Sequence, residues 1–411
     1  MRIVRLANFV TDRSGGLRTA LRCLGAGYRA AGHEPVLVVP GATADDRFVD
    51  GERVITLPGR LLPGTGGYRL LTARGPVERL LEELEPDRLE VSDRSSLRWT
   101  GRWARAAGVP SAMVSHESLT GLLRVWGAPA GPAVRLADRL NARSATTFDR
   151  IICTTGWAAE EFRRIGTPNL HRVPLGVDLT AFTPGHRDQA VRDRYADRDE
   201  VLVVHCSRLS TEKRPGLALE TVAALRAAGV PAVLVVVGDG PRRAHLERQA
   251  AGLPVRFLGF LNDRPAVAAL LASADVAVAP GPVETFGLAG LEALACGTPV
   301  VVNAASALPE VVGRAGRAAA GTGPAFGAAV LELLDRPEPD RRAAARARAE
   351  LFGWPASVTG FLAAHGAEPA VDAAARPSGD AGAPGGTRSP AGSSPTPGLG
   401  QGCRAGVGGG T

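Results

Sequence analysis

The sequence predicts an α/β protein made of two doubly wound domains, each with a parallel sheet covered by helices on both faces. Its 411 residues exceed the roughly 250 to 300 residues at which a single core stops growing. Short β-branched runs alternate with helical patterns, which requires crossover connections between parallel strands. These runs are almost continuous in Val, Ala and Leu, as expected for sheets buried on both faces.

The first domain is expected over residues 1–182 and opens with the strand RIVRLA and a helix from Gly16 to Ala31. Further strands are predicted at PVLVVP, RVITLP, RLEVSD, SAMVSH and RIICTT. Residues 183–198 are polar and proline-marked, and they are interpreted as the linker between the two domains.

The second domain, residues 199–345, repeats the rhythm with strands at VLVVHCS, AVLVVVG, VRFLG, DVAVAP and PVVV. Its helices are expected at residues 215–228, 241–251, 264–273 and 286–296. A helix over residues 346–366 is expected to return to the first domain. Residues 367–411 are almost entirely Ala, Gly, Pro, Ser and Thr, which predicts a disordered tail because they cannot bury enough surface to fold.

The composition indicates what kind of partner the protein binds and in which cellular compartment it is expected. The net charge of +7 is concentrated in residues 1–180, which hold 25 Arg against 19 Asp and Glu, so an anionic partner is expected there. The five cysteines lack metal or disulfide spacing, which favours a reducing cytoplasm. The opening MRIVRLANFV lacks the pattern of a signal peptide, and no apolar run is long enough to span a bilayer. Any membrane contact is therefore expected to be peripheral.

Lys213, the only lysine in the chain, follows a predicted buried strand, as does Arg208. Ligands of open parallel sheets bind beyond the carboxyl ends of the strands. A guanidinium fork and an ammonium group in one crevice suit a diphosphate. Two ordinary surface cations in a loop remain an equal alternative.

A second crevice element is GPVETFGLAGLEALACGTPVV. Gly287 permits close approach of the backbone to a ligand, Thr285 is expected to cap the following helix, and the helix amides offer another phosphate contact. Glu284 and Glu292 place one carboxylate on either side of such a diphosphate, toward a sugar and a ribose. Alternatively, Glu292 is an ordinary helix residue.

These segments, together with HCSRLSTEKRP, VVGDGPRRAHLERQA and the amino-terminal NFVTDRSGGLRTAL, resemble retaining glycosyltransferases of the GT-B fold, family GT4. The resemblance covers about residues 1–365, and Glu284 and Glu292 match the family's E-x7-E signature. It implies a nucleotide-sugar donor whose diphosphate is held by Arg208 and Lys213. LEVSDRSSLR, SHESL and ICTTGWAAEEFRRIG resemble more narrowly the actinobacterial GDP-mannose-dependent enzymes acting on phosphatidylinositol mannosides, in particular those extending the dimannoside through an α-(1→6) linkage.

The resemblance also implies a set of site residues. His116 matches the histidine beside the transferred sugar; a lone histidine more often serves the structure, but its place at the carboxyl end of a strand, facing the cleft, favours the functional role. The remaining positions that match the family's donor site are Gly15, Gly16, Gly238, Asp239, Phe260, Leu261, Asp263, Phe286, Gly287 and Leu288. A tight turn is the alternative for the first two glycines, and a plain surface carboxylate is the alternative for Asp263, which we expect to bind the guanine base.

Neither a metal nor another cofactor is expected. The sequence DRD at residues 197–199 superficially resembles a metal-binding motif, but it lies in the linker and not after a strand. GT-B enzymes, by the same resemblance, stabilise the leaving diphosphate with cations and helix amides.

A lipid acceptor would explain the basic first half. Residues 119–148 interleave apolar and cationic side chains, as an interfacial segment does on anionic lipids. The residues concerned are Leu122, Leu123, Val125 and Trp126 with Arg124, Arg135, Arg139 and Arg143. A solvated helix face above core residues is the equal alternative. The enzyme is expected in the cytoplasm, on the inner face of the plasma membrane.

Four other functions compete. A GT4 hexosyltransferase could use another nucleotide sugar and a soluble acceptor, and a GT-B epimerase fits the motif set less well. A non-catalytic sugar-nucleotide-binding protein need not keep both Glu284 and His116. A nucleic-acid binder is disfavoured because no basic, aromatic-rich groove is indicated.

Overall fold

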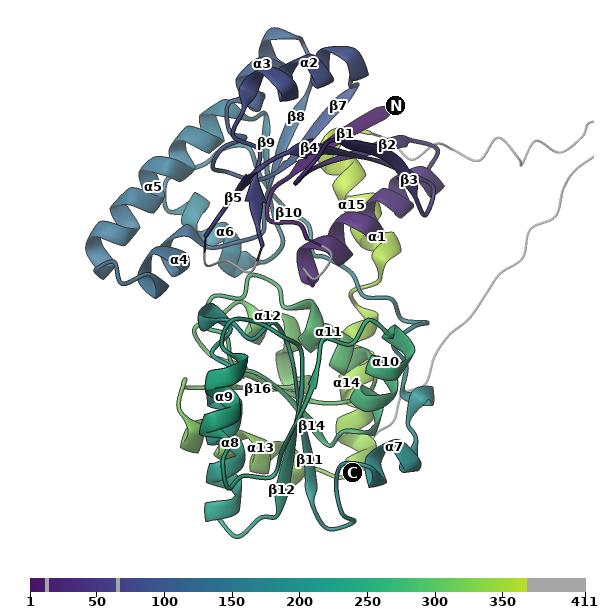
Figure 1. Ribbon diagram of the computed structural model, residues 1–411, viewed down its shortest axis with the longest axis vertical. Helices are drawn as coiled ribbons and strands as arrows, with labels where there is room; N and C mark the ends of the chain where they lie inside the picture. Colours follow the sequence, from purple (N-terminus) through teal and green to yellow (C-terminus); the bar gives the residue numbers. More distant parts are fainter. Residues whose placement is uncertain (12–14, 64–66, 368–411) are drawn as a thin grey trace, which may run out of the picture. The chain divides into compact units, whose positions relative to one another are not determined.

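Two sheets with helices on both faces organise residues 1–11, 15–63 and 67–367, the part of the chain that the computed structural model describes (Figure 1). Apart from Ala367, the tail predicted at residues 367–411 lies outside the described residues. Ala367 itself is buried, in an apolar cluster that includes residues of both lobes.

The amino-terminal lobe is built on a sheet with strand order β10-β9-β8-β7-β1-β2-β4-β3. All its strand pairs are parallel except the pair of β3 with β4 at one edge. Its strands are β1 (Arg2–Ala7), β2 (Glu34–Gly41), β3 (Asp45–Val49), β4 (Glu52–Pro58), β7 (Arg88–Ser92), β8 (Ser111–Ser115), β9 (Arg150–Cys153) and β10 (Leu170–Arg172), with a short separate pair β5 (Arg60–Leu61) and β6 (Arg69–Leu70). Its helices are α1 (Gly16–Ala30), α2 (Arg74–Leu84), α3 (Thr100–Ala106), α4 (Leu119–Val125), α5 (Ala130–Thr147) and α6 (Gly156–Arg163).

The carboxy-terminal lobe has a parallel sheet of order β13-β12-β11-β14-β15-β16, the doubly wound 3-2-1-4-5-6 pattern. Its strands are β11 (Val201–Cys206), β12 (Ala232–Val237), β13 (Val255–Gly259), β14 (Val276–Ala279), β15 (Val300–Asn303) and β16 (Arg317–Ala319). Its helices are α7 (Gln189–Asp193), α8 (Gly216–Ala227), α9 (Arg243–Gln249), α10 (Arg264–Ser273), α11 (Leu288–Ala295), α12 (Leu308–Val312), α13 (Gly323–Leu334) and α14 (Glu338–Glu350), with 3₁₀ turns η1 (Pro184–His186), η2 (Thr211–Lys213) and η3 (Gly313–Ala315). The last helix, α15 (Trp354–His365), packs on the amino-terminal lobe.

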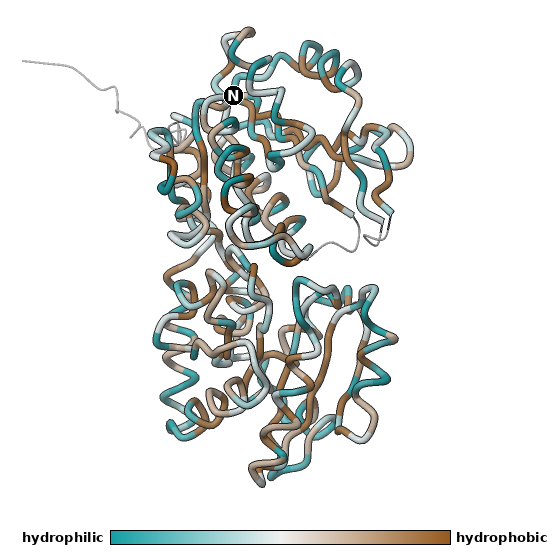
Figure 2. Tube along the Cα trace, turned by 90° about the vertical axis from the view of Figure 1, so that its left-hand side faces the viewer, coloured by the Kyte–Doolittle hydropathy of each residue, from teal (hydrophilic) through white to brown (hydrophobic). Residues whose placement is uncertain are grey.

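Successive side chains of each strand point to opposite faces of the sheet, so the core is divided between the two faces. In β11, Val203 packs with α8, α9 and α13, whereas Leu202 and Val204 face α10, α11 and α14. Figure 2 shows apolar stretches, in brown, running through the interior while hydrophilic stretches lie outside. One apolar cluster is shared by α1 and α15 of the first lobe and α10 and α11 of the second. The two sheets therefore have a common core on one side.

The elements differ from the prediction at a few places. The helix expected at residues 286–296 begins later, at Leu288, because Gly287 adopts a left-handed φ of +76° that interrupts the helix. The exposed strand β3, an antiparallel edge with every residue solvent-exposed, was not predicted. The boundary expected between residues 345 and 346 falls inside α14, which packs against α11, and the chain returns to the first lobe only with α15.

A buried charge network attaches α15 to the first sheet. Arg5 Nε donates to Glu90 Oε1 at 3.0 Å, and His365 Nε2 and the Tyr28 hydroxyl lie 3.0 and 2.8 Å from Glu90 Oε2. Burial by itself raises the pKa of Glu90, but the Arg5 charge and these hydrogen bonds hold it well below its usual range. Removing one partner of such a pair is strongly destabilising because it leaves a buried charge uncompensated.

Candidate active site

Both sheets change winding direction at a defined point, between β1 and β7 in the first lobe and between β11 and β14 in the second. Open α/β sheets bind ligands beyond the carboxyl ends of their strands at such switch points. The chain leaving β11 carries Arg208 and then the 3₁₀ turn η2, which ends at Lys213. The chain leaving β14 carries Glu284.

Lys213 and Glu284 form an ion pair at the switch point of the second lobe, between β11 and β14. Lys213 Nζ lies 2.5 Å from Glu284 Oε1, although the two residues are 71 positions apart. Gly281 leaves room for this carboxylate, since a Cβ at that position would lie 3.3 Å from Glu284 Oε1. The chain's only lysine is therefore paired with the first carboxylate of the E-x7-E motif, and both side chains remain partly open to solvent.

Arg208 is held by a carboxylate and by an aromatic ring that the sequence did not indicate. Arg208 Nη2 donates to Glu212 Oε1 at 2.6 Å, and its guanidinium lies 4.8 Å from the ring centroid of Tyr68. Tyr68 belongs to the first lobe and makes an edge contact with Phe9, which follows β1 with a left-handed φ of 59°. Glu212 lies only four positions after Arg208, but Arg208 is outside any helix, so the spacing alone does not predict the pair. Tyr68 lies 140 positions away, and nothing in its local sequence indicates the contact.

The amino termini of two helices lie close together beside these charges. α11 starts after Gly287, where a Cβ would lie 2.3 Å from Leu308 Cδ2, so glycine is needed for both its φ and its packing. α1 starts after Gly15, and a Cβ on Gly16 would lie 3.7 Å from Leu288 Cδ1. Among the described residues no side chain caps either helix, and the positive end of a helix dipole attracts an anion.

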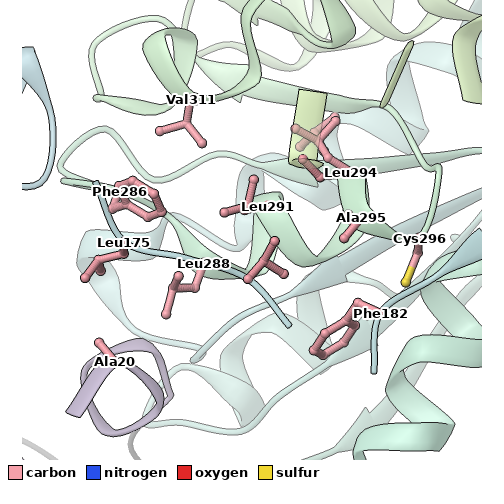
Figure 3. Close-up of a cluster of buried hydrophobic side chains, with 14 of the residues drawn as sticks. Ala20, Leu175, Phe182, Phe286, Leu288, Leu291, Leu294, Ala295, Cys296 and Val311 are labelled. Carbon is pink, nitrogen blue, oxygen red and sulfur yellow. The ribbon is translucent and has the colours of Figure 1, made fainter. Parts of the chain in front are cut away.

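The expectation that Thr285 caps α11 is wrong, because the cap position belongs to Gly287 and the Thr285 hydroxyl donates to the His116 carbonyl instead. Figure 3 shows the apolar side of α11, with Phe286, Leu288, Leu291 and Leu294 in the buried cluster. Phe286 is accordingly a core residue that makes an edge contact with Phe352, at 5.9 Å between ring centroids.

His116 lies directly after β8. Its Nε2 is 3.0 Å from Ser92 Oγ at the end of β7. Burial lowers the pKa of His116 to about 4, with Arg5 and Arg94 acting in the same direction against Glu90. The imidazole is therefore neutral at physiological pH and serves as a hydrogen-bonding group.

The loop that follows His116 is fixed by a buried polar cluster that the sequence did not indicate. Glu161 accepts hydrogen bonds from the Ser118 hydroxyl at 2.6 Å and the Thr120 amide at 2.9 Å. Arg94 donates to Asn141 Oδ1 at 2.9 Å and to the carbonyl oxygen of Glu117. The loop between β8 and α4 is thereby tied to α5 and α6, which stabilises the position of His116.

Glu292 lies on α11, one turn after its start. Burial raises the pKa of Glu292 to about 7, partly offset by Arg264 and reinforced by Asp178. Glu284, by contrast, lies before Gly287 and outside the helix, so the two carboxylates of the E-x7-E motif are not on one helix.

The remaining predicted donor residues follow β12 and β13. Gly238 and Asp239 lie against the loop after β11, where the Leu209 amide donates to the Asp239 carbonyl at 3.0 Å and a Cβ on Gly238 would clash with Ser207. Phe260 and Leu261 follow β13, two strands from β11 and hence about 10 Å away. Asp263 caps α10 by accepting from the Ala266 amide at 3.1 Å. No contact that the structure gives joins Phe260 or Asp263 to the Lys213 pair.

Metal ligation and membrane spanning find no support in the described residues. These residues contain no group of three or more His, Cys, Asp or Glu side chains arranged to ligate a metal. None of their helices has the length and apolarity needed to cross a bilayer.

Comparison with known proteins identifies the family. A glycosyl transferase 4-like domain model matches residues 15–177, and a model of glycosyl transferases group 1 matches residues 200–336. A Mycobacterium tuberculosis protein named GDP-mannose-dependent alpha-(1-6)-phosphatidylinositol dimannoside mannosyltransferase is 52% identical over 371 residues, 89% of this chain and 96% of that protein. The chain belongs to glycosyltransferase family GT4. The glycosyltransferase is also 32% identical to a GDP-mannose-dependent alpha-mannosyltransferase of Mycolicibacterium smegmatis, over 76% of this chain and 82% of that protein.

Solved structures confirm the predicted GT-B fold. Sucrose-phosphate synthase from Thermosynechococcus elongatus aligns with a TM-score of 0.70 at 20% identity, covering 88% of this glycosyltransferase and 97% of that chain. WaaG, a glycosyltransferase of lipopolysaccharide biosynthesis, aligns with a TM-score of 0.64 at 18% identity, covering 88% and 98%. At these identities the likeness concerns the fold alone.

Replacing Lys213 with Ala is expected to lower kcat/KM by about a hundredfold or more, the loss typical of one donor that stabilises developing charge. The measurement is steady-state transfer of sugar from the donor. Arg214→Ala is the matched control, because Arg214 adjoins Lys213 but donates to the Gly321 carbonyl at 3.1 Å. A Lys213→Ala enzyme with wild-type kinetics would remove this residue from the mechanism.

Glu292 predicts a specific pH dependence of stability. The pKa of Glu292 is about 7 in the folded protein against 4.5 for an ordinary glutamate. The stability that Glu292 contributes through this shift is therefore fully present below pH 4.5 and is lost as the pH rises through 7. The unfolding free energy of wild type relative to Glu292→Gln should therefore fall by up to about 3 kcal/mol between pH 4.5 and 8. Urea unfolding at a series of pH values measures it, and a difference that does not vary with pH would contradict the assignment.

Proposed function

We propose that this glycosyltransferase transfers mannose from GDP-mannose, with retention, to a phosphatidylinositol dimannoside, forming an α-(1→6) linkage and a trimannoside. The observation that carries the proposal is the 52% identity to the Mycobacterium tuberculosis mannosyltransferase of that name, which extends over 89% of this chain. The cluster of Arg208, Lys213 and Glu284 at the switch point is consistent with such a donor.

Departure of GDP is the step that the charges assist. As the anomeric bond breaks, negative charge develops on the diphosphate, where Arg208, Lys213 and the amides at the start of α11 and α1 stabilise it. The leaving group is thereby held on the face of the sugar from which it departs. The acceptor hydroxyl attacks that same face and gives up its proton to the departing diphosphate oxygen, so the bond to GDP is replaced by a bond to the acceptor and the anomeric configuration is retained.

The carboxylate and the imidazole act on the sugar. Once Lys213 is drawn to the diphosphate, Glu284 is free to accept hydrogen bonds from mannose hydroxyls. His116, neutral because burial lowers its pKa to about 4, contacts the other side of the sugar without adding a charge. We further propose that Glu292 binds the ribose and that residues after β13, including Asp263, bind guanine.

We propose that no divalent cation takes part, since Arg208, Lys213 and the amino ends of α1 and α11 supply positive charge for the leaving diphosphate. The reaction is proposed to occur in the cytoplasm, on the inner face of the plasma membrane, where GDP-mannose and a lipid acceptor meet.

The test is incubation of the purified enzyme with radiolabelled GDP-mannose, GDP-glucose, UDP-glucose or UDP-galactose and vesicles containing phosphatidylinositol dimannoside. We expect a trimannoside from GDP-mannose, with a rate that changes less than twofold in excess EDTA. Phosphatidylinositol alone is the acceptor control. Preferred transfer from a UDP-sugar or to a soluble acceptor would favour the other GT4 function, and loss of turnover in EDTA would contradict the proposal that no metal is needed.

A lipid acceptor requires contact with a membrane, and α4 and α5 offer a suitable surface. Trp126, at the end of α4, is 76% exposed and Leu136 on α5 is 44% exposed. The arginines of the expected interfacial segment, Arg124, Arg135, Arg139 and Arg143, all reach solvent. Leu122, Leu123 and Val125 are half-buried, so the apolar contact would depend on Trp126 and Leu136.

Charge reversal on this surface should weaken binding to anionic vesicles. One basic residue near an anionic surface contributes about 1 kcal/mol, so Arg139→Glu should lower vesicle binding by at least about fivefold, and Trp126→Ser should lower it as well. Flotation with phosphatidylinositol vesicles measures the bound fraction. Arg79→Glu on α2, also exposed and on the same lobe, is the matched control. Equal retention of Arg139→Glu and Arg79→Glu would place the contact elsewhere.

A further inference from the structure

Thr285 is the residue next to Glu284, and it joins the two lobes through three hydrogen bonds. Its hydroxyl donates to the carbonyl oxygen of His116 at 2.6 Å. Its own carbonyl oxygen accepts from the Thr155 hydroxyl at 2.9 Å and from the Thr154 hydroxyl at 3.4 Å. Thr285 is 8% exposed, so these bonds are largely shielded from water.

The first of these bonds connects two parts of the site directly. Glu284 precedes Thr285 in the chain, and His116 is the residue whose carbonyl is bound, so this hydroxyl joins the segment that carries a carboxylate of one lobe to the segment that carries an imidazole of the other. His116 lies just past the end of β8, whose pairing with β9 ends at Ser115 and Cys153, so its carbonyl is available to a partner from outside the sheet.

The loop after β9 is held by the second lobe at a further point. Glu310 on α12 accepts from the amides of Gly156 and Trp157 at 2.9 and 3.1 Å, at the start of α6. This contact is more open to solvent than the Thr285 contact, since the Glu310 side chain is 40% exposed. The loop therefore lies between an outer pair of hydrogen bonds at Glu310 and an inner contact at Thr285, and of these two contacts the inner one reaches His116.

We propose that Thr285 is a positioning residue, which aligns His116 with Glu284 across the lobes for sugar transfer. The inference rests on the proposed roles of Glu284 and His116, and it adds the hydrogen bond that fixes their relative position. Misplacement of a reacting group by 1 Å can lower a rate by about a hundredfold, whereas binding of the nucleotide depends on contacts at Arg208, Lys213 and Glu292. Loss of the hydroxyl should accordingly reduce kcat much more than it affects nucleotide affinity.

Two matched pairs of residues isolate the hydroxyl. Thr285 and Thr285→Val have nearly the same shape, and Thr285→Ser and Thr285→Ala form the corresponding pair without the methyl group. Each variant that lacks the hydroxyl is expected to have a kcat at least about tenfold below its hydroxyl partner, with the dissociation constant for GDP, measured by calorimetry, within about threefold. Thr285→Ser should retain most of the wild-type kcat. Should Thr285→Val fail to fold, the comparison of Ser with Ala supplies the same test.

The proposal is overturned if Val or Ala retains the kcat of its hydroxyl partner. It is also overturned if Ser loses as much activity as Val, because packing of the methyl group would then be the cause, or if kcat and GDP affinity fall together. All variants are assayed with the donor and acceptor that the wild type uses best in the panel above. The donor and acceptor that the wild type prefers thus test the proposed function, whereas the ratio of kcat values within each pair of variants tests the role of Thr285.

Discussion

The active site depends on the pairing of Lys213 with Glu284. Each group sits at the switch point of the second sheet, and each neutralises the other across 2.5 Å. An unpaired charge in so confined a place would be costly, whereas the pair is stable and still exchangeable because both side chains remain partly exposed. In the proposed reaction a diphosphate replaces Glu284 as the partner of Lys213, and sugar hydroxyls replace Lys213 as partners of Glu284. The same exchange applies to Arg208 and Glu212, 2.6 Å apart.

This exchange requires the two lobes to be held in register. A shared apolar cluster joins α1 and α15 to α10 and α11, and the buried charges around Glu90 attach α15 to the first sheet. Nearer the site, directed contacts also join the lobes: the Arg208 guanidinium lies over the Tyr68 ring, Gly16 lies beside Leu288, and the Thr285 hydroxyl donates to the His116 carbonyl. Stability is thus provided mainly by the core, whereas the geometry of the site depends on a small number of directed contacts.

Local pattern was sufficient to predict much of the fold and part of the site. Apolar runs and helical periods predicted both doubly wound sheets, and the ends of β11 and β14 placed Arg208, Lys213 and Glu284 at one edge. Helix boundaries failed where a single backbone angle decided them, as at Gly287, which starts α11 later than expected. The strand β3 was missed because its residues are all exposed and so carry no alternation of apolar and polar positions.

Contacts between residues far apart in the chain could not be predicted. Three such contacts depend on how the elements meet, and none leaves a signal in the local sequence. They are the contact of Tyr68 with Arg208, the hydrogen bond from Ser118 to Glu161, and the hydrogen bond from Thr285 to the His116 carbonyl. The pairing of Glu212 with Arg208 is local in the chain, but Arg208 precedes the turn η2, and the pair was not predicted either. Asp263 also caps α10, a role that was not predicted beside its expected contact with the base.

The most direct measurement is a crystal structure of the enzyme with a GDP-mannose analogue whose anomeric bond does not break. We expect Lys213 Nζ to leave Glu284 and to lie about 3 Å from a diphosphate oxygen, with Glu284 accepting a hydrogen bond from the sugar. An intact Lys213–Glu284 pair with the diphosphate bound elsewhere, or a diphosphate held to protein carboxylates through a metal ion, would contradict this mechanism.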